Sequence, residues 1–491
     1  MRNTTWTALL LLLCAGLISC ADTADTPIET SAETAATLPE TTAAETEFLY
    51  TDDLGDITFN GAEFRIRTIE NANVHSYVDV AEESGEVYDD ALYKRNRKIE
   101  ERFDIKITEM ICEDKSAPVR TLIQSGDDAF DLGVLRCDDA MFFYTDGLTY
   151  SISDIPNLDL TKPYWAGKLN ESLTIGGNQY VAIGDYDINV LDLTYALLFN
   201  KQMVADYDME SPYQLVGDGK WTMDAMLSMM SEVVSDINGD SVMDASDRWG
   251  FLSHSKQVSP NFWIAAGEMS ILKDKDDVPY NNMTSERFVN VWNKFFDITW
   301  DAETWFSKSI GDFDVPTDNI QIFSEGRSMF MDVSFFHIGT LRDMETDFGV
   351  LPYPKYDEAQ SEYYSRVSYY WANIVPITNT KLDMTGAILE ALNCESANYV
   401  VPAYYEIALK TKYSRDEESA AMLDLIFEGI VCDAGRTYFG TDNSSMQNLV
   451  YSISKHVYGK KTVDFASFYA KNVKGAEKCI EIFYRSVDAN E

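Results

Sequence analysis

The chain has 491 residues and carries a formal net charge of −42 at pH 7. A chain of this length exceeds what one hydrophobic core supports, so we expect two lobes or domains. The acidic balance argues against nucleic acid as a partner, because phosphates attract basic patches, and against adhesion to anionic lipid headgroups.

The chain begins with Arg2 and an apolar run from Leu9 to Cys20. A permanent membrane span needs about 20 apolar residues, so this shorter run predicts a secretory signal over residues 1–20. Its end, Leu17-Ile-Ser-Cys20, resembles the lipobox of bacterial lipoproteins. The resemblance implies cleavage before Cys20, acylation of its sulfur by palmitate, and anchoring on the extracytoplasmic face of the cell membrane. The alternative is an ordinary cleaved signal with an incidental cysteine.

Residues 21–56 are rich in Thr, Ala, Glu and Asp and contain no Lys or Arg. Such a segment buries too little apolar surface to fold. We therefore expect a disordered, self-repelling acidic tether between the anchor and the folded part.

An α/β pattern follows the tether. Strands and helices alternate, with strands expected at 63–69, 104–108 and 131–135 and helices at 87–103 and 118–124. This rhythm predicts a lobe with a mostly parallel sheet. Ligands of such sheets bind beyond the carboxyl ends of the strands, which puts the loops after Ile69 and Leu135 at a candidate site. The second loop reads Arg136-Cys-Asp-Asp139.

The next part of the chain predicts strands at 180–183 and 193–200, and a helix after Thr222, which is a plausible N-cap. Four segments here and further on resemble motifs of family 1 extracellular solute-binding proteins, the carbohydrate-type substrate-binding lipoproteins of ABC transporters. They are Leu197-Leu-Phe-Asn-Lys201, Gly219-Lys-Trp-Thr222, Phe323-Ser-Glu-Gly-Arg-Ser-Met-Phe330 and Gly349-Val-Leu-Pro-Tyr-Pro-Lys355.

The resemblance implies an α/β, two-lobe, periplasmic-binding-protein-like fold of type II, with an interlobe cleft and hinge crossings. The first lobe would comprise residues 57–166 and 373–430, and the second 167–372 and 431–491. The protein would capture a small solute, a sugar or oligosaccharide, and deliver it to the permease subunits of an ABC importer. We expect a monomer.

An acidic loop has the spacing of a calcium site. Oxygen-bearing side chains stand at loop positions one, three, five, nine and twelve, which are Asp236, Asn238, Asp240, Asp244 and Asp247. The backbone carbonyl of Val242 at position seven would be a sixth ligand. Position six is Ser241 instead of the usual glycine, and position twelve is Asp instead of Glu. We expect a structural Ca²⁺ ion; the alternative is an acidic turn that binds nothing.

Aromatic and acidic residues in loops and at strand ends are candidates for the ligand cleft. Sugar rings present apolar faces that pack on aromatic rings, while their hydroxyls need polar groups nearby. For any single aromatic residue the core remains the competing location. The candidate ligand-binding residues are Arg136, Asp138, Asp139, Trp165, Asp185, Tyr186, Asp187, Trp263, Asp332, Phe335, Tyr370 and Trp371.

Motifs of established catalytic centres are absent from the sequence: there is no G-x-S-x-G, H-E-x-x-H, P-loop or G-x-G-x-x-G. The cysteines beyond Cys20 contain no C-x-x-C pair, so neither a disulfide framework nor a zinc site is indicated. We expect a binding protein and not an enzyme. Two alternatives stay open, a surface-anchored carbohydrate-active enzyme with two carboxylates and a glycan-binding protein without a transport role.

Overall fold

The computed structural model describes residues 49–70, 74–254, 258–301, 303–306, 317–341, 344–367, 369–410, 417–438, 445–450 and 464–488. The predicted signal, Cys20 and most of the predicted tether lie outside these residues. Leu49 begins one compact unit that contains everything described. Contacts start within the predicted tether, because Tyr50 donates its backbone N–H to Asn398 and the buried Asp52 accepts two hydrogen bonds from Arg102.

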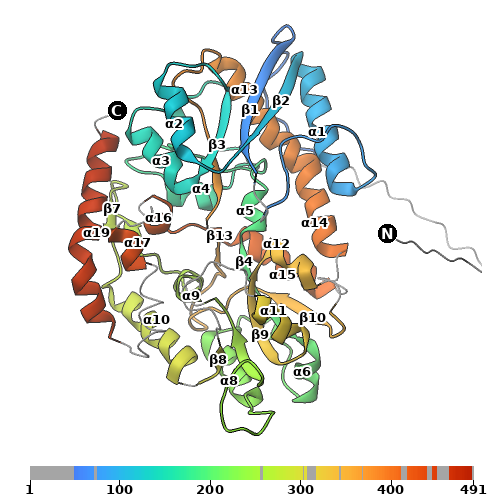
Figure 1. Cartoon of the computed structure of the whole chain (residues 1–491), viewed down its shortest axis with the longest axis vertical. Coiled ribbons are helices and arrows are strands. Elements are labelled where there is room, and N and C mark those ends of the chain that lie inside the picture. Colours follow the sequence, from blue (N-terminus) through green and yellow to red (C-terminus); the bar gives the residue numbers. More distant parts are fainter. Residues whose placement is uncertain are drawn as a thin grey trace, which may run out of the picture. The chain divides into compact units, whose positions relative to one another are not determined.

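The first lobe contains a four-stranded sheet in the order β12-β3-β1-β2 (Figure 1). Its strands are β1 (Ala62–Ile69), β2 (Ile105–Cys112), β3 (Leu132–Arg136) and β12 (Trp371–Ile374). β2 and β3 run parallel to β1, and β12 runs antiparallel to β3. The predicted strands and the mostly parallel pairing are confirmed. β12 returns from a distant part of the chain, which makes this lobe discontinuous in sequence.

Helices cover this sheet because their apolar stripes face it. In α1 (Val87–Phe103), Leu92, Ile99 and Phe103 are buried at helical spacing, while Lys94 stays exposed. The helix matches its predicted span. The other helices of this lobe are α2 (Ser116–Gln124), α3 (Cys137–Thr145), α13 (Leu382–Glu395), the turn η4 (Ser396–Val400) and α14 (Val401–Lys410).

The second lobe contains a five-stranded mixed sheet in the order β10-β4-β9-β5-β8. Its strands are β4 (Tyr195–Asn200), β5 (Trp249–Leu252), β8 (Trp305–Phe306), β9 (Ser328–Ser334) and β10 (Phe348–Leu351). Its helices and turns are α6 (Lys201–Asp206), α7 (Pro212–Gly217), α8 (Met223–Val233), α9 (Val258–Ala265), α10 (Glu286–Phe296), η2 (Asp297–Asp301), α11 (Thr317–Ser324), α12 (Phe335–Ile338), η3 (Gly339–Leu341) and α15 (Glu417–Glu428). Thr222 caps α8 as predicted, since its side chain accepts the N–H of Ala225.

One predicted strand is wrong. Residues 180–183 form no strand; they are buried loop that leads into the short helix α5 (Asn189–Asp192). These residues are apolar because they are buried, although they pair with no neighbouring strand. The sequence pattern alone does not distinguish a buried loop from a buried strand. The following strand, β4, is confirmed.

Short elements connect the two sheets. They are η1 (Ile152–Asp154), α4 (Gly167–Leu173), α5, and the parallel pair β11 (Ser365–Arg366) with β13 (Ile430–Val431). α15 packs against β10, so the segment before β13 lies with the second sheet. The remaining elements are the hairpin β6 (Ile271–Lys273) and β7 (Pro279–Asn281), α16 (Ala434–Thr437), α17 (Ser445–Val450) and α19 (Phe465–Asp488).

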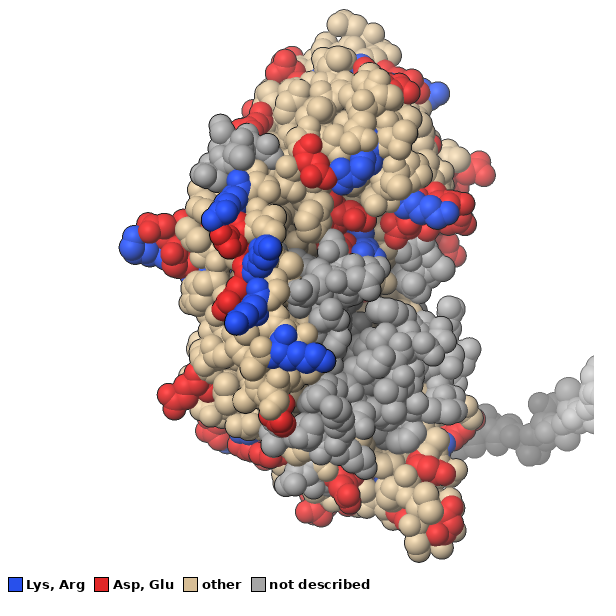
Figure 2. Space-filling model, turned by 60° about the vertical axis from the view of Figure 1, so that its left-hand side comes forward, with Lys and Arg blue, Asp and Glu red and all other residues tan. Residues whose placement is uncertain are grey.

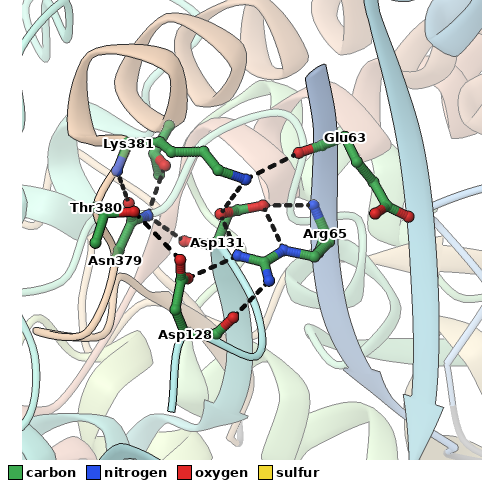
Figure 3. Close-up of polar contacts among 8 residues, drawn as sticks. Glu63, Arg65, Asp128, Asp131, Asn379, Thr380 and Lys381 are labelled. Carbon is green, nitrogen blue, oxygen red and sulfur yellow. Dashed lines mark hydrogen bonds and ion pairs between the residues drawn. The ribbon is translucent and has the colours of Figure 1, made fainter. Parts of the chain in front are cut away.

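An ionic network fastens the returning segment of the first lobe to its first strand (Figure 3). The buried Asp131 accepts hydrogen bonds on both oxygens from the backbone N–H and the guanidinium of Arg65 at 2.8–3.1 Å, and Lys381 lies 3.3 Å from Oδ1. Arg65 also pairs with Asp128 at 2.7 Å. Asn379 donates to the carbonyl of Asp131. The network lies at the end of the sheet opposite to the carboxyl ends of β1 and β3.

The surface that α19 forms carries both signs of charge. Figure 2 shows Lys and Arg side chains beside Asp and Glu on the face that comes forward from the left of Figure 1. On α19 itself, Lys471, Lys474 and Lys478 are exposed. This face therefore carries mixed charge, although the net charge of the whole chain is −42. In the part of the chain that the structure describes, no helix has the length and apolarity needed to cross a membrane.

None of the five cysteines in the described residues forms a disulfide. Cys137, Cys394 and Cys432 are buried, and Cys112 and Cys479 are partly exposed. The three buried cysteines pack as small apolar side chains.

Candidate functional site

The carboxyl ends of the parallel strands of the first sheet lie at the edge that faces the second lobe. β1 ends at Ile69 and β3 at Arg136, and Trp371 at the start of β12 pairs with Arg136. The two loops that the sequence singled out therefore lie at this edge. We call it the interlobe edge. Ligands of open α/β sheets bind at such an edge.

Arg136 and two aspartates form the polar part of the interlobe edge. Arg136 donates to both oxygens of Asp138, with distances of 2.6 and 2.8 Å, in the bidentate geometry that fixes a guanidinium. Asp138 and Asp139 occupy the first turn of α3, where the helix dipole favours negative charge. Burial and the neighbouring Asp138 nevertheless raise the pKa of Asp139 above its ordinary value. Asp139 is half-buried, so its carboxylate can accept hydrogen bonds from a ligand.

Aromatic side chains stand beside these carboxylates. The indole of Trp371 donates to Asp114 at 3.2 Å, and the ring of the half-buried Tyr369 lies edge-on to Trp371 at 5.3 Å between centroids. The backbone of Trp371 exchanges two hydrogen bonds with the side chain of Asn189. An aromatic ring next to carboxylates and a guanidinium matches the two needs of a sugar, an apolar platform and hydroxyl partners.

A second part of the interlobe edge is the loop after β1. A cavity of about 190 Å³ lies there, lined by Thr68, Tyr77, Glu109 and Trp371 among others. His75 in this loop bonds to Asp192 of α5 through its backbone N–H and through Nδ1, both at 2.7 Å. Burial opposes protonation of His75, but the hydrogen bond and charge of Asp192 outweigh it and raise its pKa.

The same loop also contacts the second lobe. The ring of His75 lies 5.3 Å from that of Phe336, which belongs to α12. The side chain of Tyr404 in α14 donates to Asp192 at 2.9 Å. Asp192 thus ties the loop after β1 and α14 to α5. We call the short elements that connect the two sheets, α5 and the pair β11–β13 among them, the hinge.

Several of the predicted ligand residues lie in the core instead of at the interlobe edge. Trp263 is buried and donates to Asp433, Phe335 packs on Phe427, and Tyr370 is 1% exposed. Tyr186 is buried with its ring 5.2 Å from the guanidinium carbon of Arg95.

Asp332 also lies in the protein interior. It accepts hydrogen bonds from Tyr353 at 2.7 Å and from Asn261 at 3.2 Å. Burial raises the pKa of Asp332 to about 7 despite these bonds. In the structure as described, these polar groups satisfy one another.

Three further predicted residues meet elsewhere. Trp165, Asp185 and Asp187 line a cavity of about 640 Å³ against the hinge. The interlobe edge therefore keeps Arg136, Asp138, Asp139 and Trp371 of the predicted set.

The sequence interpretation missed Asp114, His75 and Asp192. Asp114 could have been predicted from the sequence, because it is the second residue after β2 and so lies at the same carboxyl edge as the two loops. The contact between His75 and Asp192 could not be predicted from the sequence, because 117 positions separate the two residues and only the folded chain brings them together.

The predicted calcium loop adopts tight turns stabilised by its own carboxylates. Asp236 accepts backbone N–H groups of Gly239 and Ser241 at 2.6 and 2.7 Å, and Asp240 accepts that of Val242 at 2.8 Å. Ser241 takes φ +65°, the left-handed conformation for which glycine is usual at this position. The oxygen donors suit Ca²⁺, yet no three acidic, histidine or cysteine side chains converge as metal ligands anywhere in the described residues. Calcium binding here stays a prediction.

Comparison with known proteins identifies the fold. Neither a scan against protein-family models nor a search of curated proteins gives a match. Solved structures do match. A cyclo/maltodextrin-binding protein complexed with maltotetraose has a TM-score of 0.56 at 13% identity, covering 86% of this chain and 97% of its own. UspC of M. tuberculosis has a TM-score of 0.56 at 13% identity, with coverage of 85% and 100%.

A third match is a sugar transporter protein from Rhizobium etli in an open conformation, with a TM-score of 0.54 at 12% identity and coverage of 87% and 99%. At these identities the likeness establishes the arrangement of elements and nothing about the ligand. The chain has the two-lobe, periplasmic-binding-protein-like α/β fold that its sequence predicted.

Proposed function

We propose that the chain is an extracytoplasmic solute-binding protein of the carbohydrate type, which captures a sugar or oligosaccharide between its lobes for an ABC importer. The observation that carries the proposal is the interlobe edge, where an aromatic platform and a carboxylate–guanidinium group lie at the carboxyl ends of the first sheet in a two-lobe fold. The solved structures of this fold include a protein complexed with maltotetraose and one in complex with cycloalternan, which supports the same ligand class here.

Asp139 and Arg136 would select hydroxyl-rich, uncharged ligands. Arg136 is held by Asp138 in a fixed plane, and the half-buried Asp139 offers an acceptor. Pairs of this kind accept from and donate to the vicinal hydroxyls of a sugar. Trp371 is 2% exposed, so the half-buried Tyr369 provides the ring contact and Trp371 supports it from below.

Lipid anchoring through Cys20, delivery to permease subunits, a monomeric state and the absence of enzymatic turnover belong to the same proposal. The lipobox-like Leu17-Ile-Ser-Cys20 supports the anchor. Mass spectrometry of the mature N-terminus tests it, with a diacylglyceryl Cys20 as the expected result and an unmodified N-terminus as the contrary one.

The proposal is tested by thermal unfolding against a panel of neutral mono- and oligosaccharides. A ligand that binds only the folded state raises the melting temperature by mass action. Asp139→Asn should abolish most of the shift, whereas the matched control Asp146→Asn, at the far end of α3 with an exposed ion pair to Arg120, should keep it. No shift with any sugar would count against the ligand class.

The same samples separate binding from catalysis. Reducing ends are measured before and after incubation with the oligosaccharide that gives the largest shift. An unchanged count is expected for a binding protein, and a rising count would show that the chain is a carbohydrate-active enzyme.

A further inference from the structure

The larger cavity lies against the hinge and is separate from the interlobe edge. Its volume is about 640 Å³, within the range of small-molecule pockets. It shares no lining residue with the cavity at His75. Helix α5 divides the two: Asn189 and Asp192 bond to Trp371 and His75, whereas Val190 and Leu191 line the larger cavity. We call the larger cavity the hinge cavity.

The walls of the hinge cavity carry uncompensated negative charge. The carboxylate of Asp185 has no hydrogen-bond or ion-pair partner in the described parts of the chain, although its backbone N–H is bonded to Tyr164. Glu428 lines the cavity and is exposed. Lys168, the basic residue of the lining, is already held by Glu362 at 2.8 Å. Lys168 also interacts electrostatically with Glu428. A ligand that brings positive charge would therefore meet one carboxylate without a partner in the described residues, that of Asp185.

Asp187 is a carboxylate of a different kind in the same wall. It accepts the N–H of Gly184 at 3.0 Å and the side-chain amide of Asn373 at 2.6 Å. These bonds fix its position, and its charge lies close enough to Asp185 to oppose ionisation there. A cation beside Asp185 would offset that repulsion.

Aromatic rings complete the hinge cavity. Tyr50, Trp165, Tyr405 and Phe427 line it, and the Trp165 ring is held in place by its hydrogen bond to Glu390 at 3.1 Å. Burial raises the pKa of the Tyr405 hydroxyl, and the charges of Asp424, Asp185 and Glu428 add to the rise in that order. Aromatic faces beside carboxylates attract organic ammonium ions through cation–π and Coulomb interactions.

We propose that the hinge cavity binds a small organic cation, an amine or quaternary ammonium compound, with Asp185 as the residue that pairs with its charge. The lining residues come from both sides of the hinge. Trp165 lies near α4 and Tyr405 in α14, and the remaining lining includes residues of the stretches 184–191 and 427–430, which cross the hinge. The occupied cavity would couple to the relative position of the lobes, so the cation would change the affinity of the interlobe edge for its own ligand.

The affinity for the cation depends on pH. Burial and the charge of Asp187 raise the pKa of Asp185 to about 7, and burial raises the pKa of Asp187 to about 7 as well, so both carboxyl groups lose charge as the pH falls through 7. The other titratable or charged groups that face it are Glu428, Tyr405 and Lys168. Since the cation binds the ionised carboxylate, binding weakens as the pH falls from 8 to 6.

The test is a titration of the full chain with choline, putrescine and arginine methyl ester, followed by melting temperature and by tryptophan fluorescence. The neutral carbon analogue of choline, 3,3-dimethylbutan-1-ol, is the ligand control. We expect at least one cation to raise the melting temperature and the neutral analogue to leave it unchanged. If none of the three cations does so, the proposal is overturned.

Two variants locate the site. Asp185→Asn should weaken binding of the cation about tenfold or more, because a charged partner is lost. Glu428→Gln should weaken it less. Asp146→Asn, which removes an exposed carboxylate at the end of α3 outside the lining, should leave it unchanged. Equal affinity of the Asp185→Asn variant and the wild type would refute the assignment. Sugar binding in the absence of cation is measured in the same variants and should survive, which separates this proposal from the proposed function.

Discussion

Replacement of Asp131 by Asn tests how the discontinuous first lobe is held together. Asp131 is fully buried and bonds to Arg65 of β1 and Lys381 before α13 (Figure 3). Asn has nearly the same shape but no charge, and its NH₂ group would face the donors of Arg65. Breaking a buried ion pair on one side costs about 3–5 kcal/mol. Arg65 keeps Asp128 and is 20% exposed, so we expect the lower end, about 3 kcal/mol.

The assay is urea unfolding followed by far-ultraviolet circular dichroism, with Asp128→Asn as the matched control. Asp128 is 35% exposed, so its replacement should cost about 1 kcal/mol or less. A difference below about 0.5 kcal/mol between the Asp131→Asn variant and the wild type would refute the role of the network.

The free energy that Asp131 contributes to folding should depend on pH, and the direction of its pKa shift predicts how. Burial opposes ionisation of Asp131, but the hydrogen bonds and charge of Arg65 outweigh it and lower its pKa. The stabilisation is therefore complete above the unfolded pKa of about 4 and is lost as the pH falls through the lower folded pKa. The free-energy difference between wild type and variant should shrink in that acidic window, and a difference independent of pH would contradict the ion pair.

Three further predictions concern the site and the calcium loop. Ser241→Gly should stabilise the protein by about 0.5–1 kcal/mol in thermal unfolding, because φ +65° strains a residue with a Cβ atom; a destabilised variant would contradict this. Chelation by EDTA should lower the melting temperature if Asp236 and its loop hold Ca²⁺, and an unchanged value would count against the ion. His75→Gln should destabilise the protein more at pH 5.5 than at pH 8, since the raised pKa of His75 makes its pair with Asp192 contribute at low pH and fade as the pH rises; the reverse order in urea titrations would refute the pair.

Much of the fold was predictable because its local signals agree with its tertiary structure. The strand of β1 alternates apolar and charged residues, and α1 repeats apolar residues at helical spacing. The segments 180–183 and 193–200 show the limit: both are buried and apolar, yet only the second finds partners, β9 and β10.

The candidate site was predictable where it depends on strand order. Parallel strands place their following loops at one edge, so Arg136, Asp138 and Asp139 could be assigned from the pattern alone. Aromatic residues were harder, because a ring serves the core and a ligand equally well. Trp263 and Tyr370 are buried, whereas Tyr369 is half-exposed at the interlobe edge, and no feature of the sequence distinguishes them.

The hydrogen bonds of Asp192 to His75 and Tyr404 could not be predicted from the sequence for a different reason. The three residues come from the hinge helix, the loop after β1 and α14, and they meet only when the chain has crossed between lobes. Contacts of this kind carry no local periodicity.

The central claim is that two lobes close on a sugar and release it unaltered, and small-angle X-ray scattering tests it most directly. The radius of gyration of the mature protein is measured with and without a saturating concentration of the best oligosaccharide of the panel. Our account predicts a smaller radius for the liganded protein, because closure brings the lobes together. An identical radius in both samples, with the ligand shown to be bound, would contradict it.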